Sequence, residues 1–172
     1  MAAAFALALT LGGCSLVGSS AKPAATNTVP SALDALVPTF PATLTPARAK
    51  SGSVSAIDAI QALIASSEIV HVDDQSKLVA ATKSTGAFYG AERAVTTKSG
   101  FDTIDQGVAM EKLLVEAGWI ERADNTSTTA YTAQLTTYTP AGVSALLIEA
   151  DASPGVAPVL LIELESPDLP RK

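Results

Sequence analysis

The 172-residue chain predicts an α+β fold, in which two or more helices cover one face of an antiparallel sheet of three to five strands. Two observations predict it. Apolar residues recur at helical spacing in two segments, and toward the C-terminus their period changes to two, as in strands with one buried face. Turn residues separate the C-terminal strands so closely that neighbouring strands must pair antiparallel.

The first helix is expected over residues 54–66, with Ser53 placed to cap its N-terminus. Apolar residues recur there at helical spacing: Val54, Ile57, Ile60 and Ile64. The segment 68–72 is short and rich in β-branched residues, which fits either a strand or an extension of the helix. The segment 87–97, which lies between two glycines and carries aromatic residues, predicts a strand.

The second helix is expected over residues 103–117. Asp102 is placed to cap its N-terminus, and Gly118 offers the left-handed residue that ends many helices. Trp119, the single tryptophan, follows this glycine directly. An apolar residue at that position commonly folds back on the last helical turn, so we expect Trp119 to be a core residue.

A meander of strands is expected after the second helix. In residues 129–138 apolar side chains alternate with polar ones, and two turns, Pro140–Gly142 and Ser153–Gly155, separate the segments that follow. The expected strands are 129–138, 143–151 and 156–165, with a further one at 119–123.

Composition favours a folded domain, because 48% of the residues are hydrophobic and 16% are charged. The 17 acidic and 11 basic residues give a net charge of −6. No basic stripe runs along the chain, which excludes a nucleic-acid-binding role. The same negative charge disfavours contact between the domain and anionic lipid.

The N-terminus is an apolar stretch, Met1–Gly13, that is too short to span a membrane and lacks a basic residue at its start. It ends in Leu11-Gly12-Gly13-Cys14, which contains the only cysteine. This run resembles the lipid-attachment motif of bacterial lipoproteins. The resemblance implies that residues 1–13 are a signal peptide, with an incomplete basic region, and that Cys14 carries a diacylglyceryl group.

The lipoprotein resemblance also implies a location and a way of binding the membrane. The two acyl chains on Cys14 would hold the protein on the outer face of the bacterial cell membrane. Ala117-Gly118-Trp119 at the end of an amphipathic helix is similar to what small secreted lipoproteins of high-GC Gram-positive bacteria show. This second resemblance implies no functional residue.

Residues 14–53 are expected to be a tether, and residues 54–172 a single globular domain. Five of the ten prolines lie in the tether, which is rich in Ser, Ala and Thr. A small group of apolar residues interrupts it: Leu33, Leu36, Val37 and Phe40. We interpret this group as a segment that packs on the domain or as a stray helical turn, and a short docking motif is the alternative.

Few residues suggest chemistry. His71 is the only histidine and has Asp73 and Asp74 beside it, which we interpret as a surface turn after a strand, with a metal or acid/base site as the alternative. No nucleophile, phosphate-binding or metal motif occurs, and no cofactor or metal is predicted. Four acidic residues on adjacent expected strands are interpreted as a solvated face: Glu149, Asp151, Glu163 and Glu165.

The sequence therefore predicts a membrane-anchored extracytoplasmic lipoprotein with a non-catalytic binding or interaction domain. Its partner would be an envelope protein or a small molecule. The alternative is a carrier or sensor of a small apolar ligand, held in a cavity between helices and sheet and lined by Leu146, Ile148, Leu160 and Ile162. A third hypothesis is an enzyme built around His71.

Overall fold

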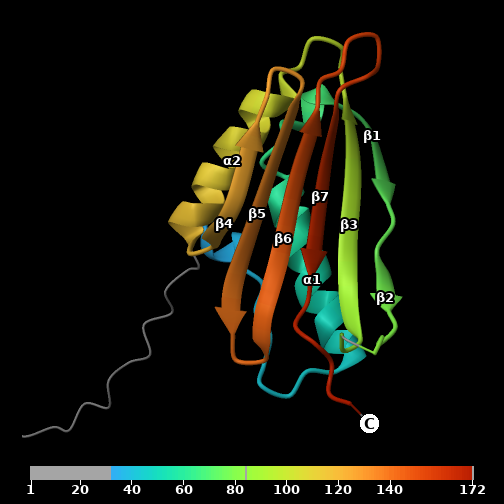
Figure 1. Ribbon diagram of the computed structural model, residues 1–172, viewed down its shortest axis with the longest axis vertical. Helices are drawn as coiled ribbons and strands as arrows, with labels where there is room; N and C mark the ends of the chain where they lie inside the picture. The colour runs from blue at the N-terminus through green and yellow to red at the C-terminus, as the bar shows by residue number, and fades with distance from the viewer. Residues whose placement is uncertain (1–31, 84, 172) are drawn as a thin grey trace, which may run out of the picture.

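Residues 32–83 and 85–171 are described by the computed structural model, and they form an antiparallel sheet of seven strands with two α-helices on one face (Figure 1). The α+β class is confirmed, and the sheet is larger than the expected three to five strands. In chain order the elements are η1 (Asp34–Leu36), α1 (Pro46–Gln61), η2 (Ser66–Glu68), β1 (Ile69–Asp74), β2 (Lys77–Val79), β3 (Phe88–Thr97), α2 (Thr103–Ala117), β4 (Ile120–Thr126), β5 (Ala130–Thr139), β6 (Gly142–Asp151) and β7 (Val159–Glu165).

The strand order across the sheet is β1-β3-β7-β6-β5-β4, and β2 also pairs with β3. The expected antiparallel meander is confirmed as β4 to β7. Its last strand, β7, then pairs with β3, so the C-terminal strand lies in the middle of the sheet. The sheet gains its extra strands at one edge, where β1 and β2 pair with β3 one after the other.

The edge strands carry weak sequence signals. All seven residues of β4 are exposed, so the strand shows no alternation of buried and exposed positions, and it continues to Thr126, beyond its expected end at residue 123. β2 has three residues, too few for a period to be visible. The expected alternation in β5 is confirmed, because Tyr131, Ala133 and Leu135 are buried.

The second helix has the expected bounds. The Asp102 carboxylate accepts hydrogen bonds from the backbone N–H groups of Ile104 (3.1 Å) and Asp105 (3.0 Å). Gly118 ends the helix with a φ of 109°, a conformation that favours glycine. Trp119 is 2% exposed, which confirms its place in the core.

The first helix begins earlier than expected: α1 spans Pro46–Gln61, whereas the apolar period predicted residues 54–66. Thr45 caps it, because its hydroxyl accepts a hydrogen bond from the N–H of Arg48 at 3.3 Å, and Pro46 suits the first helical position. The early turns contain alanine, serine and glycine, of which Ala49 and Ser53 are buried. Small buried residues leave no apolar period, so these turns were missed.

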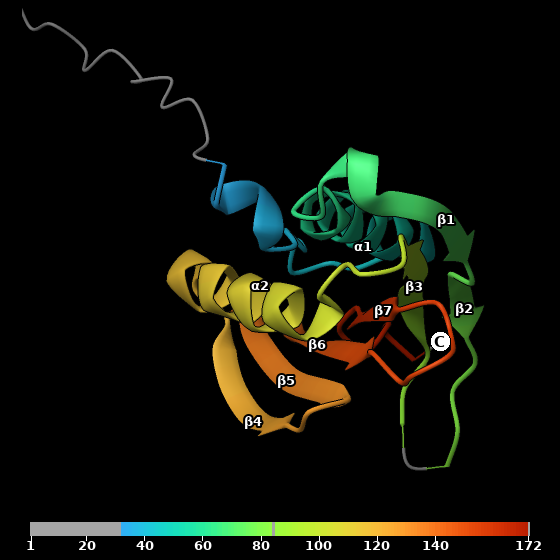
Figure 2. The same cartoon turned by 90° about the horizontal axis from the view of Figure 1, so that it is seen from above.

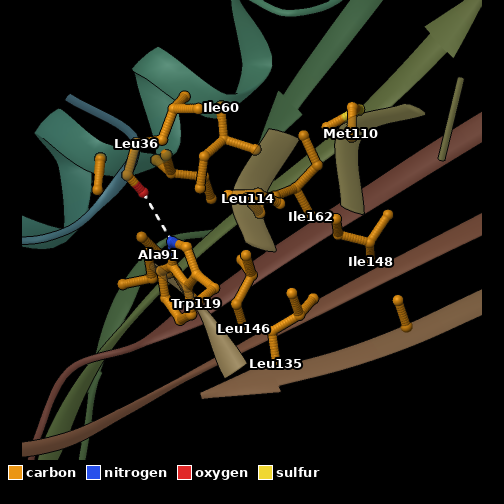
Figure 3. Close-up of a cluster of buried hydrophobic side chains, with 14 of the residues drawn as sticks. Leu36, Ile60, Ala91, Met110, Leu114, Trp119, Leu135, Leu146, Ile148 and Ile162 are labelled. Carbon is orange, nitrogen blue, oxygen red and sulfur yellow. Dashed lines mark hydrogen bonds between the residues drawn. The ribbon is translucent and has the colours of Figure 1, made fainter. Parts of the chain in front are cut away.

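The segment before α1 packs on the domain, as the interpretation of its apolar group predicted. Leu36, Phe40 and Leu44 are at most 3% exposed and belong to the core. The indole N–H of Trp119 donates a hydrogen bond to the carbonyl oxygen of Leu36 at 3.0 Å (Figure 3). The folded part of the chain therefore begins before residue 54, and residues 14–31 of the expected tether lie outside the described residues.

The core is a single layer of side chains between the helices and the sheet (Figures 2 and 3). α1 contacts β3 and β7, and α2 contacts β5 and β6. α2 approaches β5 closely at Gly107, where an added Cβ would lie 2.6 Å from the ring of Tyr131. Within the described part of the chain, no helix has both the length and the apolar character needed to cross a membrane.

We expect Trp119→Phe to lower the free energy of unfolding by about 2 kcal/mol, because the buried carbonyl of Leu36 loses its donor and the smaller ring leaves a gap. A denaturant titration followed by circular dichroism measures this. Tyr138→Phe is the control, since Tyr138 is 67% exposed, and it should change stability by less than about 0.5 kcal/mol. Equal losses in both variants would show that the Trp119–Leu36 contact is not important.

Candidate functional site

The sheet has one face that the helices do not cover, which we call the open face. Figure 2 shows α1 and α2 on the same side of the sheet, and no layer of the described residues lies on the other side. Side chains of the open face alternate with core positions along each strand. Those used below are His71, Asp73, Lys77, Glu92, Ala94, Arg122, Thr132, Gln134, Thr136, Tyr138, Ala145, Leu147, Glu149, Asp151, Leu161, Glu163 and Glu165.

The strand register aligns these side chains in rows across the sheet. In one row, Glu92 of β3 is followed by Glu163 of β7, Leu147 of β6 and Gln134 of β5. The rows on either side have the same mixture of charged, apolar and polar residues. They are Gly90, Glu165, Ala145 and Thr136, and Ala94, Leu161, Glu149 and Thr132.

The four acidic residues expected on one face all lie on the open face. Between β6 and β7 the register separates them, because Glu163 is opposite Leu147 and Glu149 is opposite Leu161. On its other side, Glu163 is directly opposite Glu92 of β3. This like-charge pair was not predicted, because it depends on a pairing between strands far apart in the sequence. Like charges in that position destabilise a sheet.

Two of these glutamates are partly buried, and their carboxyl groups hold protons more tightly than an exposed glutamate does. Burial raises the pKa of Glu163, and the charges of Glu92, Glu165 and Glu149 raise it further, whereas Lys77 acts in the opposite direction. Burial and the charge of Asp168 raise the pKa of Glu165. The ionised open face is therefore under electrostatic strain that a positive charge would relieve.

A shallow hollow of about 230 Å³ lies on the open face beside these glutamates. Ala145 and Leu147 line it together with Glu163, Glu165 and Arg122. The Arg122 guanidinium donates from Nε to the hydroxyl of Thr136 at 2.7 Å and from Nη2 to that of Tyr138 at 3.3 Å. A second hollow, of about 410 Å³, lies next to the first and shares Ala145 and Glu165 with it.

His71 and Asp73 lie on the open face of β1, where they pair with Thr96 and Ala94. They belong to an edge strand. The strand alternative for residues 68–72 is confirmed, and the expected turn at Asp73 and Asp74 is wrong, because β1 continues to Asp74. The His71 ring is exposed and makes no hydrogen bond with the described residues, while Asp73 accepts one from Gln75 at 2.9 Å. Among the described residues, no group of three histidine, cysteine or acidic side chains is placed to hold a metal ion.

Asp74 points to the helix side, where it pairs with a buried arginine that the sequence analysis missed. Arg93 forms ion pairs with Asp74 of β1 and, at 3.1 Å, with Asp58 of α1. Hydrogen bonds from Ser76, with the charge of Arg93, lower the pKa of Asp74. The sequence signal that could have revealed this residue is its charge, because Arg93 occupies a position in the expected strand 87–97 whose side chain points to the core. Arg93 joins α1 to the edge strand, which is a structural role.

A second group of carboxylates lies between α2 and β4. The hydroxyl of Tyr131 donates a hydrogen bond to Glu111, and Glu121 lies beside them. The charge of Glu111 raises the pKa of Glu121, with burial and the charge of Asp124 adding to it. Because Tyr131 is a core residue bonded to α2, we assign this group to helix packing.

The residues expected to line a carrier cavity lie in the core. Leu146, Ile148, Leu160 and Ile162 are each at most 2% exposed and pack with their neighbours. An apolar hollow of about 520 Å³ does exist, at the start of α1, and Leu44, Leu78 and Leu169 are among the residues that line it. The expected lipid-attachment residues Leu11, Gly12, Gly13 and Cys14 lie outside the described residues.

We expect Glu163→Gln to stabilise the protein at pH 7 by up to about 1 kcal/mol, because the amide keeps the shape and removes the charge. Since the folded-state pKa of Glu163 is raised above 4.5, the charge destabilises the fold above that raised pKa. The gain should shrink as the pH falls through it and vanish below the unfolded pKa. Urea titrations between about pH 4 and pH 7 measure the difference.

The matched control is Glu116→Gln, a glutamate exposed on α2, away from the open face. Its effect on stability should be small, because an exposed surface charge contributes little. A gain for Glu163→Gln that stayed constant with pH would contradict an electrostatic cause.

The open face as a whole is a surface that combines apolar and anionic side chains. Comparison with known proteins adds no further information on its role: no family model, curated protein or solved structure matches this chain.

Proposed function

We propose that the chain is a membrane-anchored extracytoplasmic lipoprotein, and that its folded domain is a non-catalytic binding domain whose binding surface is the open face. The anchor in this proposal is the diacylglyceryl group on Cys14, inferred from the motif Leu11-Gly12-Gly13-Cys14. Two acyl chains bind a bilayer stably, so the domain would need no lipid contact of its own.

The single observation that supports the binding surface is the make-up of the open face. One face of an antiparallel sheet can be solvated, and its side chains are then mainly polar. Here half-buried Leu147 and Leu161 lie near the centre of the sheet, beside glutamates whose pKa is raised. Covering these leucines with a partner would remove apolar surface from water, which favours association.

A binding role is favoured over a catalytic one by the surroundings of the only histidine. A histidine that activates a nucleophile is itself held by a hydrogen-bonded partner. His71 is exposed and makes no such bond with the described residues. The carrier alternative has less support, because the four residues expected to line a ligand cavity pack against their neighbours in the core.

The anchor is tested by metabolic labelling with a fatty-acid analogue in cells that express the native chain. We expect the native protein to be labelled and Cys14→Ala to be unlabelled, because this is the only thiol that can accept the diacylglyceryl group. Ser20→Ala is the control and should label like the native protein. An unlabelled native protein would refute the anchor.

The binding surface is tested by photo-crosslinking in intact cells, with benzoylphenylalanine in place of single residues of the anchored protein. Thr132 lies on the open face, opposite Glu149, whereas Val108 is 43% exposed on α2. We expect a discrete adduct from position 132 and none from position 108. The reverse pattern, or equal adducts at both positions, would refute the open face as the binding surface and leave the labelling result intact.

A further inference from the structure

We propose that the partner of the open face is a basic segment of another polypeptide, in which lysine or arginine residues alternate with apolar ones. The inference rests on the proposed function and adds the chemistry of the partner. It is carried by the charge of the open face, by the apolar side chains between its carboxylates, and by the distances over which the carboxylates are spread.

The open face has an excess of negative charge. Among the described strand residues, Lys77 and Arg122 are its two cations and six carboxylates point to it, which leaves an excess of four negative charges. The hydrogen bonds of the Arg122 guanidinium go to the hydroxyl groups of Thr136 and Tyr138, which carry no charge. The six carboxylates are those of Asp73, Glu92, Glu149, Asp151, Glu163 and Glu165.

Apolar side chains lie between these carboxylates. Leu147 is opposite Glu163, and in the next row Leu161 lies between Ala94 and Glu149. A partner with charges alone would leave both leucines in water. A segment that alternates basic and apolar side chains would cover the leucines and neutralise the carboxylates together.

The carboxylates as a set are spread too widely for one small cation to neutralise all of them. Neighbouring strands are about 4.8 Å apart and residues of one face recur about every 6.8 Å along a strand, so the acidic residues of β3, β7 and β6 extend over about 10 Å. No three of the described acidic or histidine side chains are grouped to hold a metal ion. Several cationic side chains on one extended chain can reach them, and each contact would be a charge-assisted hydrogen bond.

Other occupants carry the wrong charge. Two copies of this chain joined by their open faces would bring the four excess charges of each against those of the other. Anionic lipid and nucleic acid are repelled for the same reason. A basic polypeptide is the class of partner whose charge complements the face.

The test uses the purified full-length protein in uncharged detergent micelles. The probe is a blocked peptide of about ten alternating lysine and leucine residues, a length that matches the strands of the sheet. Matched peptides have glutamine or glutamate in place of lysine. Fluorescence anisotropy of the labelled peptide gives the affinity, and amide chemical shifts of the protein show where the peptide binds.

We expect the lysine peptide to bind, to shift amides of β3, β6 and β7 most, and to bind at least about tenfold more tightly than the glutamine peptide. Glu92→Gln combined with Glu163→Gln should weaken binding about tenfold, and Glu116→Gln should leave it unchanged. Raising the salt from about 0.02 to about 0.2 M should weaken binding. Raising the pH from about 5 to about 7 should strengthen it, because burial raises the pKa of Glu163 and Glu165 and these two carboxyl groups ionise more fully at the higher pH.

The inference is overturned if the glutamine peptide binds as tightly as the lysine peptide, if the shifted amides lie elsewhere, or if no peptide binds. Binding of the lysine peptide that is insensitive to the Glu92 and Glu163 substitutions also overturns it. These outcomes can be distinguished from failure of the proposed function. The crosslink from position 132 tests only whether the open face is the surface used in cells, and it forms whatever the charge of the partner.

Discussion

The structure depends on the burial of one face of a seven-stranded sheet under two helices. Alternate residues of β3, β7, β6 and β5 point to α1 and α2, and each large side chain buried there contributes about 1.5–3 kcal/mol relative to exposure. The two helices lie on the same side, so the alternation that builds the core also places every second side chain in the open face. The core and the candidate binding surface are therefore two consequences of one strand pattern.

Two polar contacts secure this layer at its margins. The indole of Trp119 binds the carbonyl of Leu36 and so holds the segment before α1 against the core. Arg93 joins Asp58 of α1 to Asp74 of β1, which ties an edge strand to a helix. A buried arginine is tolerated because both carboxylates and Ser76 satisfy its hydrogen bonds. Neither contact faces the open side, so neither supplies the glutamates there with a cationic partner.

Local signals predicted local structure well and long-range structure poorly. Asp102 and Gly118 marked the ends of α2, since a cap and a left-handed glycine act within one helical turn. The alternation of β5 identified its buried face. The start of α1 was missed, because Ala49 and Ser53 are buried through their small size and leave no apolar period. Phe40 was placed in a tether although it is fully buried, since local composition does not report what a segment packs against.

Residue order alone was sufficient for the α+β class, for the C-terminal meander and for the gathering of Glu149, Asp151, Glu163 and Glu165 on one face, because short turns leave neighbouring strands a single way to pair. The place of β7 between β6 and β3 required the folded structure. That pairing joins strands far apart in the chain and is selected by burial of the whole face, which no local pattern encodes. Because of this pairing, Glu92 lies directly opposite Glu163, and the acidic residues belong to a charged and partly apolar surface at the centre of the sheet.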